Sequence, residues 1–161
     1  MKTYLKSESS SILGNEAYIS SIFLDNSELW TLTKELEDEI HVFQRRLLKQ
    51  ILGVYYPRTI TNKYLYEKTN LQPWSQTIRV RRLRWLGHVL RLPQSSPASI
   101  ALKEALRIVN KPRGGQIATW LSLVKKQLVQ LNVPDFEIAE LIAQSRNHWS
   151  SLISRTMSPV E

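Results

Sequence analysis

The chain has 161 residues, a net charge of +8, 42% hydrophobic residues with five tryptophans, and no cysteine. This composition predicts one folded domain, or one domain with a tail, and it excludes disulfides, thiol catalysis and thiolate zinc sites. No apolar run approaches the roughly 18 residues of a membrane span, and the N-terminal residues lack the apolar segment of a signal peptide. We therefore expect an intracellular protein, nuclear or cytoplasmic, that is not secreted and has no membrane partner.

The charge is distributed unevenly along the chain. Residues 1–40 carry three lysines against eight acidic residues, and residues 127–161 carry two arginines against four acidic residues. Between them, residues 41–126 carry seventeen lysines and arginines against two glutamates, a net charge of +15. A central block of this charge is typical of nucleic-acid binding. A membrane-surface role is less favoured because the block spans several predicted helices rather than one amphipathic segment.

Residues 1–16 are polar and aperiodic, and we expect them to be disordered. Residues 17–24 are short and apolar, and periodicity does not separate helix from strand there. The next helix begins at Thr33 as N-cap and ends at Gly53, with acidic residues in its first turns and basic residues near its end, as suits the helix dipole. Its apolar stripe, expected to pack on Trp85 and its neighbours, is Leu36, Ile40, Phe43, Leu47 and Ile51.

A loop over residues 54–60 leads to a short helix that Thr61 caps and Asn70 ends. Tyr64 and Tyr66 on this helix have side chains that could stack on bases, but tyrosines in such positions are more often half-buried packing residues. We therefore favour packing for both.

The stretch Arg79–Pro93 reads RVRRLRWLGHVLRLP, and Pro73 opens its helix. At 100° per residue, the side chains on one broad arc of this helix are mainly apolar. Val80 and Gly87 lie outside this arc, on the polar side of the helix. The arc holds Ile78, Arg82, Trp85, Leu86, Val89, Leu90 and Leu92. The opposite face carries a line of cationic and polar side chains, Arg81, Arg84, His88 and Arg91.

This helix has two interpretations. The first is a helix laid along a phosphate backbone, with the line in contact and Arg79 and Arg82 as lesser contributors. The second is an ordinary solvated face on which long side chains cover apolar surface.

Pro93 ends the Arg-rich helix, and Ser96 and Pro97 begin another that runs to about Ile108. The basic loop over 110–116 adds Lys111 and Arg113 to the candidate phosphate contacts. It lacks the glycines and the Lys-Ser/Thr of a nucleotide-binding loop.

The rest of the chain predicts three more helices. A second apolar stripe is Ile117, Trp120, Leu121, Val124, Leu128 and Leu131. Further helices should start at Pro134 and at Ser145, and residues 156–161 should fray. The chain thus predicts an all-α fold of five to seven helices with short loops over residues 17–155.

Several blocks occur in the order of one known family. They are WTLTKELE at 30–37, FQRRLLKQILG at 43–53, TN at 61–62, RRLRWLGHVLRLP at 81–93, WLSLVKKQL at 120–128 and AQSRNHW at 143–149. This order resembles the C-terminal region of reverse transcriptases from LINE-type non-LTR retrotransposons, the endonuclease-reverse transcriptase family. The resemblance implies thumb and post-thumb helices that hold template and primer, with sequence-independent contact to DNA or RNA backbone.

The catalytic carboxylates of that family are missing from the chain. Polymerisation needs carboxylates that hold two metal ions, and the family's aromatic-Ala-Asp-Asp turn does not occur in this sequence. We therefore expect no catalytic residue, no metal, no cofactor and no small-molecule substrate. The alternative function is a helical protein-interaction module, or a decayed element product without a nucleic-acid role. DNA or RNA preference and oligomeric state stay open.

Overall fold

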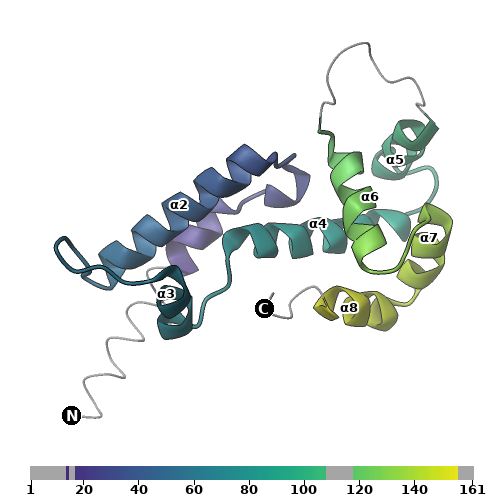
Figure 1. Cartoon of the computed structure of the whole chain (residues 1–161). Coiled ribbons are helices and arrows are strands. Elements are labelled where there is room, and N and C mark those ends of the chain that lie inside the picture. The colour runs from purple at the N-terminus through teal and green to yellow at the C-terminus, as the bar shows by residue number, and fades with distance from the viewer. Residues whose placement is uncertain (1–13, 15–16, 108–117, 156–161) are drawn as a thin grey trace. The chain divides into compact units, whose positions relative to one another are not determined.

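The computed structural model describes residues 14, 17–107 and 118–155, and every regular element among them is helical (Figure 1). This confirms the all-α prediction. The number of helices slightly exceeds five to seven because residues 17–23, which the sequence left undecided, are helical and a 3-10 turn, η1 (Ser27–Leu29), follows them. The predicted disorder of residues 1–16, apart from Gly14, and the predicted fraying of 156–161 lie outside the described residues.

Seven α-helices follow η1 along the chain. They are α2 (Lys34–Ile51), α3 (Asn62–Thr69), α4 (Trp74–Leu90), α5 (Pro97–Arg107), α6 (Trp120–Gln130), α7 (Phe136–Gln144) and α8 (Arg146–Ser154).

The ends of α2 and α3 and the start of α8 coincide with the capping residues predicted from the sequence. Thr61 precedes α3, and its hydroxyl accepts a hydrogen bond from the backbone N–H of Tyr64 at 3.2 Å. Asn70 ends α3 with φ 52°, and Gly53 follows α2 with φ 64°, so both turn the chain through the left-handed region that asparagine and glycine tolerate. Ser145 is the N-cap of α8, and its hydroxyl accepts a hydrogen bond from the backbone N–H of His148. These boundaries are local, which is why the sequence predicts them.

The chain divides into two compact units, which we describe separately. Unit 1 comprises Met1–Asn26 and Lys34–Thr77, and unit 2 comprises Ser27–Thr33 and Ile78–Glu161. The division falls within α4, so the first residues of this helix belong to unit 1 and the remainder to unit 2.

A buried glutamine joins the helices of unit 1. The Gln44 side chain is fully buried on α2; its Nε2 donates to the Gln72 carbonyl at 3.0 Å. Its Oε1 accepts from the Trp74 backbone N–H at 2.9 Å and from the Tyr66 hydroxyl at 3.3 Å. One amide thus satisfies groups on α3, on the following loop and at the start of α4, as buried polar groups require. Burial raises the pKa of Tyr66, and the nearby Arg45 charge opposes that shift.

Three aromatic rings complete the packing of unit 1. The Phe23 ring centroid lies 4.6 Å from that of Trp74 and 5.4 Å from that of Phe43. The ring partners of Phe43 within unit 1 are therefore Phe23 and Trp74. The predicted apolar stripe of α2 is corrected, because Phe43 stays 44% exposed. The buried residues of α2 are Ile40, Gln44 and Leu48.

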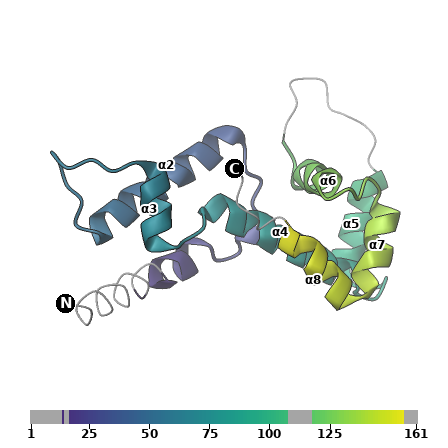
Figure 2. The ribbon, with the colours of Figure 1, turned by 60° about the horizontal axis from the view of Figure 1, so that its bottom comes forward.

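Unit 2 is built around α4. Its core combines Val80, Leu83 and Leu86 of α4 with residues of α6, α7 and α8, and the ribbon shows α8 beside α4 (Figure 2). The Trp149 indole of α8 packs directly over Gly87, where any Cβ would collide with it. Its Nε1 donates to the Leu83 carbonyl at 3.0 Å.

Val80 and Gly87 are consequently buried, which corrects their predicted place on the polar side. A single helical wheel assumes one buried face, but α4 is covered by several helices at once.

Replacing Gly87 with alanine tests this contact. Alanine favours a helix over glycine by about 1 kcal/mol, but the added methyl group meets the indole, so Gly87→Ala should lower the free energy of unfolding by about 1–3 kcal/mol. In a Trp149→Leu background the indole is gone, and Gly87→Ala should then be neutral or stabilising. Urea unfolding of the four proteins measures this coupling. Equal effects of Gly87→Ala in both backgrounds would contradict the proposed close approach.

Candidate nucleic-acid interface

The solvent-facing part of α4 is narrow. Buried positions occupy more than half of its circumference at 100° per residue, because Val80 and Gly87 extend the apolar arc. Of the predicted line, Arg84 and His88 are exposed on the remaining arc, one turn apart. The His88 ring contacts the Trp85 ring at a centroid distance of 5.4 Å. Arg84 and His88 are therefore the members of the line that α4 presents most openly.

Arg82 does not belong to this surface. Its side chain is 2% exposed, and its Nη2 donates to the Trp30 carbonyl at 2.8 Å. Trp120 makes a similar contact through its indole, whose Nε1 donates to the Glu28 carbonyl at 2.7 Å. Together these two side chains hold the segment Ser27–Thr33 in unit 2. The structure therefore removes Arg82 from the candidate phosphate contacts.

Arg91 has a structural role, because it hydrogen-bonds the end of α7. It follows the end of α4, and its Nη1 donates to the Ala143 carbonyl at 3.0 Å. Ala143 lies in the last turn of α7, where carbonyls have no partner within the helix. Burial lowers the pKa of the half-buried Arg91, and the nearby Arg146 charge lowers it further. Only part of the Arg91 guanidinium is therefore open to another ligand.

The other predicted contacts vary in their placement. Arg79 is exposed and Arg81 is half-buried, and each takes part in an interaction within the protein. Lys111 and Arg113 lie outside the described residues.

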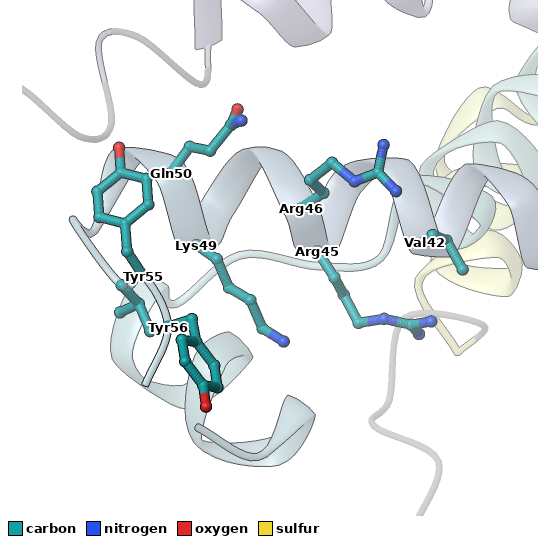
Figure 3. A pocket seen from close by; sticks show the side chains of 8 residues that line it. Val42, Arg45, Arg46, Lys49, Gln50, Tyr55 and Tyr56 are labelled. Atoms are coloured by element: carbon teal, nitrogen blue, oxygen red, sulfur yellow. The ribbon is translucent and has the colours of Figure 1, made fainter. Parts of the chain in front are cut away.

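A second basic surface lies on unit 1. Arg45, Arg46 and Lys49 of α2 line a shallow hollow together with Tyr55 and Tyr56 from the loop after the helix (Figure 3). Sequence reasoning assigned the two tyrosines only to a loop, and it attributed the three cations to the helix dipole and to the basic block over residues 41–126. The missed signal was their proximity in sequence, because cations at 45, 46 and 49 followed by YY at 55–56 bring charge and aromatic rings to the same end of one helix.

Three further observations bear on function. The described residues contain no group of three or more His, Asp or Glu side chains that could hold a metal ion. None of the helices among them is long and apolar enough to cross a membrane. Compared with protein families, curated proteins and solved structures, the chain matches none.

Arg84 and Arg91 of the predicted line should affect stability differently when each is replaced. Arg91→Ala removes the donor to the Ala143 carbonyl and should cost about 1–2 kcal/mol of unfolding free energy. Arg84→Ala, at an exposed position, should change it by no more than about 0.5 kcal/mol. Urea unfolding of both variants provides the measurement, and equal losses would show that Arg91 has no special structural role.

Proposed function

We propose that this chain is a non-catalytic segment of the LINE-type reverse transcriptase kind, and that it binds nucleic-acid backbone through its basic block. The RRLRWLGHVLRLP motif at 81–93 supports the family, and the +15 charge of residues 41–126 supports the ligand. An all-α fold is compatible with the thumb-like role that the resemblance implies.

The observation that carries the binding proposal is the exposure of cations on ordered helices. Arg84, Arg46 and Lys125 are exposed on α4, α2 and α6. Among the described residues, none of these three makes an ion pair. A guanidinium can fork onto two phosphate oxygens. Contacts to phosphate position the protein without reading bases, so binding should not depend on sequence.

A second candidate function rests on exposed apolar side chains of unit 2. Leu141 on α7 is 75% exposed, and Val129 on α6 is exposed as well. Such residues suit a helical protein-interaction module, the alternative that the sequence left open. Single exposed apolar residues are common on protein surfaces, so the cationic surface remains the stronger basis.

Salt dependence of binding tests the proposed function. Duplex DNA should bind with a Kd in the range of ~10⁻⁴–10⁻⁶ M, with a slope of about −0.9 in log K against log salt for each phosphate neutralised. Arg84→Ala with His88→Ala should flatten the slope by about 1–2 units without loss of helicity in circular dichroism.

The matched control removes Lys125 and Lys126, which are exposed on α6 of the same unit. If this control flattens the slope equally, the exposed arc of α4 has no special role. If the unmodified chain does not bind DNA at all, the protein-interaction function becomes the better proposal.

The non-catalytic part of the proposal has its own test. A primed template incubated with the chain, nucleotides and Mg²⁺ or Mn²⁺ should show no extension, because the sequence lacks the paired aspartates that would hold two metal ions. Extension that disappears when one residue of this chain is replaced would overturn it.

A further inference from the structure

The hollow on unit 1 has the size of a small-molecule or nucleotide site. Its volume is about 430 Å³, within the roughly 300–1,000 Å³ range of ligand pockets. Its lining combines three cations with two aromatic rings and the apolar side chains of Val42 and Val54. No acidic residue contributes to it, so the hollow favours an anionic ligand that also has a flat apolar face.

Neither ion pairs among the described residues nor, for two of the three, the helix dipole explains the cations Arg45, Arg46 and Lys49 on α2. Lys49 lies in the last turn, where it suits the helix dipole. Arg45 and Arg46 lie a turn earlier, beyond the reach of that effect. Within the described part of the chain, none of the three makes an ion pair. The three neighbouring cations therefore concentrate positive charge at this end of α2, and an anion would be attracted to it.

Tyr55 and Tyr56 are much more exposed than tyrosines that pack against the rest of a protein. Tyr55 is 64% exposed and Tyr56 is 94% exposed. Tyr66 on α3, by contrast, is half-buried and donates to Gln44. Aromatic side chains normally bury most of their surface, so two adjacent exposed rings at the edge of a cationic hollow are available for a flat partner.

The side chains are arranged in two groups around the end of α2. Arg45 and Lys49 extend on the side of Tyr56, whereas Arg46 and Gln50 extend on the side of Tyr55 (Figure 3). The cationic side chains thus extend on both sides of the end of α2, as the two rings do. A nucleotide has the same pairing of parts, a planar base joined to a phosphate.

We propose that this hollow is a subsite for unpaired nucleotides of a single strand. Bases stack on Tyr55 and Tyr56, and the adjoining phosphates contact Arg45, Arg46 and Lys49. A duplex keeps its bases stacked on each other and offers only phosphates here, so the subsite favours single-stranded over duplex nucleic acid. This inference rests on the proposed function, which it deepens by naming the form of nucleic acid.

The test compares variants on three ligands, namely single-stranded oligothymidylate, duplex DNA of the same length, and heparin. Heparin is polyanionic but has no bases. Tyr55→Leu with Tyr56→Leu removes both flat rings and should weaken binding of the single strand by at least about 5-fold for each stacked base, or about 30-fold in total. Binding of duplex and heparin should not change.

Two matched variants separate stacking from charge. Tyr55→Phe with Tyr56→Phe retains both rings and should bind the single strand like the unmodified chain. Arg45→Gln with Lys49→Gln should flatten the salt slope for the single strand by about 1.4 units, at about 0.7 per phosphate. Circular dichroism should show the same helicity for all variants.

The outcomes distinguish this inference from the proposed function. If the leucine variant loses duplex and heparin binding as much as single-strand binding, or binds the single strand normally, the subsite is refuted while backbone binding stands. If the unmodified chain binds none of the three ligands, the proposed function fails and this inference fails with it. If an acidic peptide such as polyglutamate binds as tightly as the single strand, and the leucine variant loses both equally, the hollow is a protein-docking site instead.

Discussion

The close packing of Trp149 on Gly87 is the contact on which unit 2 depends. Glycine lets the indole approach the α4 backbone, and the Leu83 carbonyl fixes the ring through its Nε1. Because α8 covers α4 at Gly87, the buried positions of α4 extend over more than half of its circumference. Interiors are packed at crystal-like density, so a ligand can reach α4 only along the arc that carries Arg84 and His88.

This constraint separates the arginines of the Arg-rich stretch into distinct roles. Arg82 faces inward and holds the Trp30 carbonyl, and Arg91 supports the end of α7 through Ala143. Arg84 points to solvent on the arc that packing leaves open. A run of arginines in sequence is therefore not one cationic surface, because each position on the helix meets a different neighbour. Arg82 and Arg91 serve the fold by donating to backbone carbonyls, whereas the exposed Arg84 is available to a ligand.

Different contacts hold the helices of unit 1 together. A fully buried glutamine amide and three aromatic rings hold α2 against α3 and the start of α4. The buried amide needs every partner it has, since an unpaired buried polar group costs free energy. With Gln44 and Leu48 facing inward, Arg45, Arg46 and Lys49 lie toward the outside of α2. The internal network thereby fixes the orientation of the cations that line the hollow beside Tyr55 and Tyr56.

The sequence by itself determined the helical class, the ends of α2 and α3, the starts of α5 and α8, and the concentration of positive charge in the middle of the chain. These properties follow from local chemistry, because caps, prolines and left-handed residues act within a few positions of themselves. Only the tertiary structure decided that Arg82 is buried, that Val80 and Gly87 face the core, and that Phe43 stacks on Phe23. Those outcomes depend on which distant segment covers each face, and a periodic pattern on one helix does not contain that information. The exposure of Tyr55 and Tyr56 was also not predictable from the sequence, because it depends on the folded unit and not on the loop sequence alone.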